Sequence, residues 1–180
     1  KKRERRRASS IPIVSIVGYT NSGKSTLLNL LTKSRVEVED KPFSTLNPTT
    51  RMIKYPERRK IILTDTVGFI TRLPEVLLRA FMATLEELED AHLLLHLVDI
   101  SAPDLEDRIA SVEGVIDGLG LSGKRRFIVF NKRDRVDPAV AANVEKRYNA
   151  VSISSLRKQG IDRLIAAIET AVGGEHLAAN

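Results

Sequence analysis

The chain contains neither cysteine nor tryptophan, and aromatic side chains make up only 4% of its 180 residues. Without cysteine it can form neither disulfide bonds nor metal sites built on thiolates. Its longest apolar run, Leu93–Val98, includes His96 and is far shorter than the ~20 residues of a membrane-spanning helix. The composition therefore excludes a disulfide scaffold and predicts no transmembrane segment, while the length suits one domain with a proper core.

Positive charge is concentrated at one end of the chain. The net charge is +6, and the six basic residues and one acidic residue of Lys1–Arg7 supply most of it. Such an arm could bind RNA phosphates or an acidic membrane surface. Alternatively, it is a solvated helix end, and these two interpretations stay open. We expect a basic linker arm over 1–10, the main domain over 11–172 and a C-terminal tail over 173–180. Because no secretion signal is visible, we expect a cytoplasmic protein, and we expect it to be a monomer.

The stretch Gly18–Ser25 fits Gly-x-x-x-x-Gly-Lys-Ser, a loop that wraps a phosphate with inward-pointing backbone N–H groups. The apolar run Ile11–Val17 before it predicts a buried parallel strand, and Ser25–Leu31 after it predicts a helix whose positive end faces the same anion. We expect Lys24 to lie between the outer phosphates and the Ser25 hydroxyl to ligate Mg²⁺. The other predicted nucleotide contacts of this loop are Asn21, Ser22, Gly23 and Thr26.

Alternating strands and helices follow. Residues 34–50 show no periodicity and predict a long functional loop, whereas 49–55 and 60–65 predict two antiparallel strands joined by a hairpin turn. Further strands are expected at 93–100, 126–131 and 150–153, and helices at 74–89, 104–119, 138–148 and 161–172. This order predicts an α/β fold with a doubly wound, mostly parallel six-stranded sheet. Its second strand is antiparallel, and its site lies at the carboxyl ends of the strands.

Two further motifs end predicted strands. In Asp65–Gly68 the carboxylate of Asp65 is expected in the Mg²⁺ shell, and Gly68 would let a backbone N–H reach the terminal phosphate. In Asn131–Asp134 the carboxylate of Asp134 can accept hydrogen bonds from guanine N1–H and N2–H₂, a pair that adenine lacks. The sequence therefore predicts a guanine nucleotide. Its base would be held by Asn131, Lys132 and Asp134, with a weaker loop of Ser154, Ser155 and Leu156 on the base oxygen.

The histidines offer little chemistry. His92 and His96 could share one face of a strand, but no third metal ligand lies near them in the sequence. Structural histidines are therefore expected rather than a metal site.

Together the three motifs resemble the small GTPase domain of the translation-factor class, a P-loop NTPase with a Ras-like G domain. Gly18–Thr26, Phe43–Arg51 and Asp65–Ile70 look like the HflX family, ribosome-associated GTPases of the wider Obg-like group. The resemblance covers Ile11 to about Val172, and Phe43–Arg51 is its specific part. Two departures from the family pattern are visible: Ser44 and Asn47 stand for alanine and aspartate, and Ser154-Ser155 stands for Ser-Ala.

The resemblance implies a Mg²⁺-dependent GTP/GDP switch. Thr45 would reach Mg²⁺ in the GTP state, with Thr49 and Thr50 as alternatives, so that Lys24, Thr45 and Gly68 form the expected catalytic set. Phe69 stands where Ras-like enzymes carry a water-orienting glutamine, which predicts slow intrinsic hydrolysis. The implied partner is the ribosome, its large subunit and RNA, which would stimulate that hydrolysis.

Several alternatives remain open. Asn21 lies where some related GTPases hold a monovalent cation, so it would either bind K⁺ or bond within its own loop. The chain is expected to be a G-domain fragment, with the basic arm as the end of a helical linker. Two competing functions are a nucleotide-gated binding module with negligible hydrolysis, and a related GTPase of RNA modification or ribosome assembly.

Overall fold

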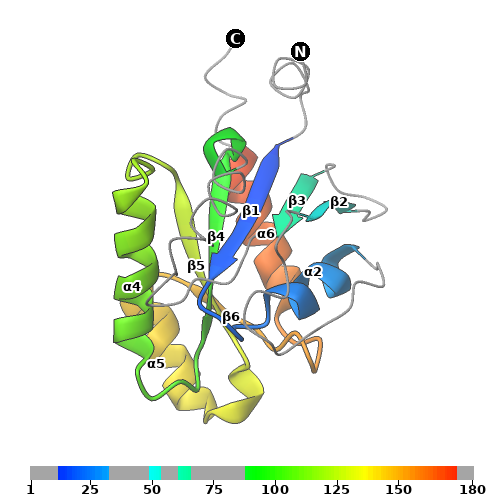
Figure 1. Cartoon of the computed structure of the whole chain (residues 1–180). Coiled ribbons are helices and arrows are strands. Elements are labelled where there is room, and N and C mark those ends of the chain that lie inside the picture. Colours follow the sequence, from blue (N-terminus) through cyan, green and yellow to red (C-terminus); the bar gives the residue numbers. More distant parts are fainter. Residues whose placement is uncertain (1–11, 33–48, 54–60, 66–87, 174–180) are drawn as a thin grey trace.

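The computed structural model describes residues 12–32, 49–53, 61–65 and 88–173, and it contains a sheet of six strands in the order β2-β3-β1-β4-β5-β6 (Figure 1). Strand β1 pairs in parallel with β3 and β4, and β4, β5 and β6 continue in parallel. Strand β2 runs antiparallel to β3. The predicted α/β fold is confirmed. The strands are β1 (Ile13–Gly18), β2 (Thr49–Ile53), β3 (Ile61–Asp65), β4 (Leu93–Asp99), β5 (Arg126–Asn131) and β6 (Val151–Ser152).

The described helices begin and end close to the predicted positions. They are α2 (Lys24–Thr32), α4 (Leu105–Gly118), α5 (Pro138–Tyr148) and α6 (Ile161–Gly173), with a short 3₁₀ turn, η1, at Arg133–Arg135. Proline in the first turn suits α5, since its missing N–H would have no helical partner there. Asn149 ends α5 in the left-handed conformation. Of the helix predicted at 74–89, only 88–89 fall among the described residues, and both are helical.

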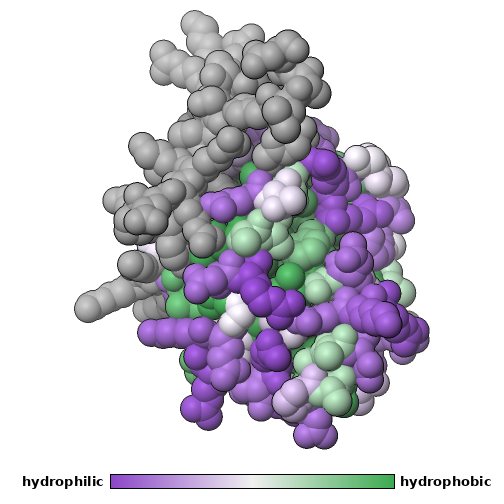
Figure 2. Space-filling model, turned by 180° about the vertical axis from the view of Figure 1, so that it is seen from behind, coloured by the Kyte–Doolittle hydropathy of each residue, from purple (hydrophilic) through white to green (hydrophobic). Residues whose placement is uncertain are grey.

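Apolar side chains alternate along the central strands and so reach both faces of the sheet. In β4, Leu93, Leu95 and Leu97 belong to a core cluster that includes leucines of α2 and the apolar side of α6. Leu94 and Val98 point to the opposite face, where clusters with residues of α4 and α5 lie. Figure 1 shows the same division, with α4 and α5 on one side and α2 and α6 on the other. Hydrophilic side chains cover much of the described surface in Figure 2.

The direction in which the chain leaves the sheet changes between β1 and β4. The chain passes from β1 to α2 on one face, and from the neighbouring β4 to α4 on the other. In open α/β sheets, ligands bind outside the carboxyl ends of strands at such a switch point. Strand β1 ends here at Gly18, β4 at Asp99 and β5 at Asn131. The ends of β1, β4 and β5 therefore meet at the carboxyl edge of the sheet, where the site is predicted.

His92, just before β4, and His96, within it, both have structural contacts. His92 Nδ1 accepts a hydrogen bond from the backbone N–H of Ile13 (3.0 Å), and the buried His96 lies with its Nδ1 3.1 Å from Glu113 Oε1. No group of three or more potential metal-ligating side chains occurs among the described residues. Within the same ranges, none of the helices is both long and apolar enough to cross a membrane.

Candidate nucleotide-binding site

Both glycines of the predicted phosphate loop are required by close approaches. A Cβ on Gly18 would lie 2.4 Å from the carbonyl oxygen of Leu97 in β4. Gly23 has φ of +96°, and a Cβ there would lie 2.3 Å from Nδ2 of Asn131. Real Cβ atoms do not approach other atoms so closely, and positive φ strains any other residue type. The phosphate loop therefore packs directly on β4 and on Asn131–Asp134, the segment predicted to hold the base and called the base loop below.

Two side chains of the phosphate loop, Lys24 and Ser22, place buried polar groups within it. Lys24 is only 8% exposed, and its ammonium donates to the carbonyl oxygens of Gly18 (3.4 Å) and Tyr19 (3.2 Å). Ser22 Oγ is buried and has no hydrogen-bond partner among the described residues. Because a buried hydroxyl without a partner is unfavourable, this atom suits a site completed by a polar ligand. Ser25 and Thr26 lie in the first turn of α2, whose N-terminus faces the loop.

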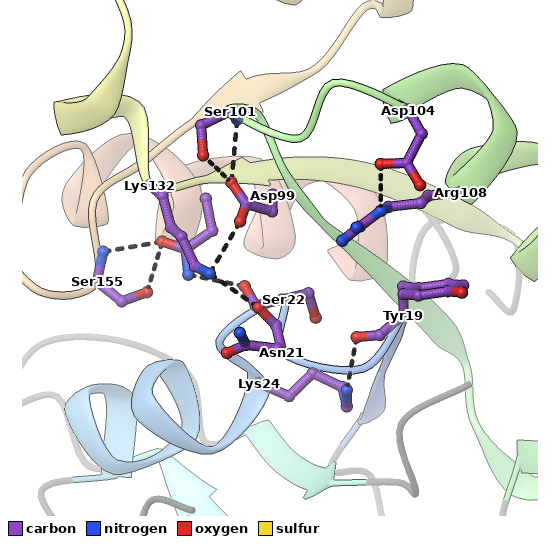
Figure 3. A network of polar contacts seen from close by, with 11 residues as sticks. Tyr19, Asn21, Ser22, Lys24, Asp99, Ser101, Asp104, Arg108, Lys132 and Ser155 are labelled. Carbon is purple, nitrogen blue, oxygen red and sulfur yellow. Dashed lines mark hydrogen bonds and ion pairs between the residues drawn. The ribbon is translucent and has the colours of Figure 1, made fainter. Parts of the chain in front are cut away.

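Two adjacent side chains of the base loop bind two adjacent carbonyl groups of the phosphate loop, and Figure 3 shows the contact made by Lys132. Asn131 Nδ2 donates to the carbonyl oxygen of Ser22 (3.0 Å), and Lys132 Nζ donates to that of Asn21 (2.8 Å). Asn131 Oδ1 also accepts two bonds from Ser155, one from its N–H and one from its Oγ (both 3.0 Å). The buried Asn131 thus joins three loops, a role that its prediction as a nucleotide contact did not include.

Asp99 also belongs to this network, and the sequence reasoning did not single it out. Its Oδ2 lies 2.8 Å from Lys132 Nζ, and its Oδ1 accepts bonds from the N–H (3.0 Å) and the Oγ (2.6 Å) of Ser101. Burial alone would raise the pKa of Asp99, but the bonds from Lys132 and Ser101 outweigh it and hold the pKa below its ordinary value. The sequence offered one signal, which Asp99 shares with Asp65: a carboxylate at the end of an apolar strand.

Asp134 stands apart from this network. It is exposed in η1, and within the described part of the chain its carboxylate makes no hydrogen bond or ion pair. It lines a hollow of about 750 Å³. A carboxylate in this position remains available to a ligand. The other lining residues are Arg133, Val136, Pro138, Arg157 and Gln159.

The remaining predicted residues are described to different extents. Backbone register places Asp65 beside Ile16, near the end of β1, but its side chain is outside the description. Thr45, Gly68 and Phe69 lie outside the described residues. In the loop that follows β6, Ser154 and Ser155 are buried, whereas Leu156 is 72% exposed. Their predicted contact with the base oxygen stays a prediction.

Helix α4 also contacts the phosphate loop, which the sequence did not suggest. The guanidinium carbon of Arg108 lies 4.9 Å from the centre of the Tyr19 ring, within the range of a cation–π interaction. Arg108 Nε in turn lies 2.7 Å from Asp104 Oδ1, one helical turn earlier (Figure 3). A basic residue of α4 thus contacts the ring of Tyr19 in the phosphate loop.

The sequence pattern of the family described as "50S ribosome-binding GTPase" matches residues 13–132, from β1 to Lys132 of the base loop. This chain belongs to that family. It is 49% identical, over 93% of its length, to the GTPase HflX of Caldanaerobacter subterraneus subsp. tengcongensis, and 39% identical, over 96%, to that of Escherichia coli. The matches cover 38% and 41% of those proteins, so the chain spans about two fifths of their length. The resemblance to HflX is confirmed.

Solved structures share the fold. A GTP-binding protein from Sulfolobus solfataricus in complex with GDP is 30% identical with a TM-score of 0.73, covering 91% of this chain and 53% of its own. The structure of Era with MgGDPNP and a segment of 16S ribosomal RNA is 26% identical with a TM-score of 0.70, covering 89% and 56%. Both proteins bind guanine nucleotides, as their descriptions state.

Proposed function

We propose that this chain is the GTP-binding and GTP-hydrolysing switch domain of a ribosome-associated protein. The observation that carries the proposal is the joint between the two nucleotide loops, in which Asn131 and Lys132 hold the carbonyl groups of Ser22 and Asn21. This joint sets a phosphate cradle and a base-reading carboxylate at a constant separation. One guanine nucleotide spanning both loops explains why they are tied together.

The described residues fit the phosphates of GTP or GDP. Gly18 and Gly23 let the loop pack closely against Leu97 and Asn131, Lys24 supplies an internal positive charge, and Ser22 Oγ is a buried hydroxyl in need of a partner. The helix dipole of α2 favours an anion at its N-terminus. Lys24, the Ser22 hydroxyl and the N-terminus of α2 would each stabilise negative charge at this loop. The di- or triphosphate of a nucleotide is the ligand that meets them together.

The donor set also fits Mg²⁺, which prefers oxygen ligands. Ser25, Asp65 and Thr45 would hold the ion, and the ion would supply positive charge to the outer phosphate oxygens when bound. Lys24 stabilises the charge that develops on the transferred phosphoryl group, and the products are GDP and phosphate. Thr45 and Gly68 would sense the terminal phosphate, so that the segments carrying them change state on hydrolysis. K⁺ near Asn21 would be an additional positive charge.

The proposed partner is the large ribosomal subunit and its RNA, and the proposed location is therefore the cytoplasm. The description of the matching family as "50S ribosome-binding GTPase" supports this partner. The chain covers only part of those relatives, so the partner and its stimulation of hydrolysis belong to the proposal.

Replacing Asp134 by asparagine tests the base site. Asp134→Asn exchanges an acceptor for a donor opposite the guanine 2-amino group, so GTP affinity should fall by at least ~100-fold. Xanthosine triphosphate, which carries an oxygen at that position, should bind better than it does to wild type. Titration with fluorescent nucleotides measures both affinities.

Asp137→Asn is the matched control, because Asp137 is also exposed, lies three residues further on and makes no side-chain cap bond to α5. It should leave both affinities unchanged. Unaltered GTP binding in Asp134→Asn would refute the assignment of the guanine site.

A further inference from the structure

Asp99 places a buried negative charge at the junction of the two nucleotide loops. It ends β4, which lies between β1 and β5, and the strand register pairs it with Asn131. The residue is 9% exposed and belongs to none of the recognised nucleotide motifs. A buried carboxylate is unfavourable unless it is paired and hydrogen-bonded, so its partners indicate what it does.

The carboxylate of Asp99 is anchored on one side and holds a cation on the other. Ser101 donates two hydrogen bonds to Oδ1, while Oδ2 lies 2.8 Å from Lys132 Nζ. The same ammonium donates to the carbonyl oxygen of Asn21 at 2.8 Å. Figure 3 shows Lys132 reaching down between Asp99 and the phosphate loop. Asp99 therefore directs Lys132 onto that loop.

Lys132 needs such a partner because a lysine ammonium sits on a flexible four-carbon stem. A carbonyl oxygen alone would hold it weakly, whereas a carboxylate neutralises the charge and restricts the stem. Lys132 (φ +63°) and Asn21 (φ +61°) are both non-glycine residues in the left-handed conformation. Backbone strain of this kind persists only where the surroundings hold it, and the contact from Lys132 to Asn21 joins the two strained positions.

We propose that Asp99 is a positioning residue for guanine-nucleotide binding. It acts through Lys132 and keeps the base loop and the phosphate loop at the separation that one nucleotide spans. This inference rests on the proposed function. Because Asp99 acts on the joint and not on the outer phosphate, its loss should weaken GDP and GTP binding by the same factor. Because Asp134 reads the base, the preference for guanine over xanthine should not change.

Titration of the full chain with fluorescent GDP and GTP provides the test. Asp99→Asn should bind both about tenfold more weakly, the loss expected for one charge-assisted hydrogen bond. Its ratio of GTP to xanthosine triphosphate affinity should equal that of wild type. The matched control is Asp117→Asn. It makes the same substitution in α4, at a carboxylate that lies 3.2 Å from Arg126 Nη2 of β5. Asp117→Asn should bind GDP as tightly as wild type.

A double-mutant cycle separates positioning through Lys132 from a general structural effect. If Asp99 acts through Lys132, then Asp99→Asn should weaken GDP binding no further in a Lys132→Met background. Additive losses would overturn the proposal. Should Asp99→Asn fail to fold, as judged by circular dichroism, Ser101→Ala replaces it. That variant removes one anchor of Asp99, and it should show a smaller loss that disappears in the Lys132→Met background. Unchanged affinity in Ser101→Ala would then overturn the proposal.

The wild-type titration distinguishes the two levels of failure. A wild-type chain that binds neither GDP nor GTP would refute the proposed function, and this inference with it. A wild-type chain that binds GDP, together with an Asp99→Asn variant that binds it equally well, would refute the role of Asp99 alone.

Discussion

At the scale of single residues, Gly23 meets two requirements at once. Its φ of +96° allows the turn of the phosphate loop, and the space where a Cβ would stand is taken by the Asn131 amide. The second requirement comes from a residue that lies far along the chain. Gly23 is therefore part of the joint between the two loops as well as part of the phosphate cradle.

Gly23→Ala should disrupt that joint. The added methyl group would displace Asn131 from the carbonyl oxygen of Ser22, so GDP affinity should fall by more than about tenfold, beyond what one neutral hydrogen bond contributes. Gly120→Ala is the matched control, because Gly120 also has positive φ (+73°) but nothing within 4 Å of the added carbon. Both variants should lose stability through backbone strain, and only Gly23→Ala should lose GDP binding. Equal GDP affinity in the two variants would contradict this account.

At the scale of elements, Glu145 connects three parts of the C-terminal region. From α5 it accepts bonds from the N–H (2.7 Å) and Oγ (2.6 Å) of Ser152 in β6, and its other neighbour is Arg163 of α6. Burial by itself would raise the pKa of Glu145, but the bonds from Ser152 and Arg163 hold that pKa below its ordinary value of 4.5. The carboxylate thus stabilises a strand of only two residues.

Glu145→Gln should lower the free energy of unfolding by about 1.5–3 kcal/mol at pH 7, the range for hydrogen bonds to charged groups. Because the folded pKa is lowered, the stabilisation by Glu145 is complete above pH 4.5 and is lost as the pH falls through the folded pKa. The difference between wild type and variant should therefore shrink below pH 4.5. Urea denaturation at several pH values measures it.

Glu106→Gln is the comparison for Glu145, since Glu106 forms an exposed ion pair with Arg147 (2.8 Å). Exposed pairs contribute little, so this variant should change stability by less than about 1 kcal/mol at any pH. A constant difference between wild type and Glu145→Gln down to pH 3 would rule out the proposed role of the carboxylate charge.

At the scale of the whole molecule, the described residues bring the predicted binding groups together and include no evident group that would orient the attacking water. Lys24, Asn131 and Lys132 meet at the carboxyl edge of the sheet, whereas the position after Asp65–Gly68 is occupied by Phe69, outside the described residues. Phenylalanine has no polar group with which to orient the attacking water. A partner would have to supply that group or an additional positive charge.

The chain alone should hydrolyse GTP at or below ~10⁻³ s⁻¹, comparable with unassisted Ras-type turnover. Single-turnover assays with and without ribosomes, in K⁺ and in Na⁺ at matched ionic strength, measure this rate and its stimulation. Phe69→Ala should leave GTP affinity almost unchanged. A rate of several per second without any partner would mean that another residue of this chain aligns the water. Equal rates in the two salts would favour a structural Asn21 over a K⁺ site.

Local sequence was sufficient to predict the described strands and helices and the positions of the described loops between them. The eight residues Gly18–Ser25 lie between an apolar strand and a leucine-rich helix, and the structure has both. Strand periodicity likewise located β4 and β5 and the loops that follow them. Such patterns are readable because turn chemistry and alternation depend on residues that are close in the chain. They also indicated that the strand ends meet at one edge.

Which side chains meet at that edge was decided by the tertiary structure. Asn131 and Ser22 are separated by 109 positions, and their bond exists because β4 alone separates β1 from β5 in the sheet. Local periodicity carries no record of strand order, so neither this bond nor the pairing of Asp99 with Lys132 could be predicted. Asp99 looks in the sequence like any polar residue that ends a strand. It becomes a buried anchor because the neighbouring strand delivers an ammonium 2.8 Å from its carboxylate.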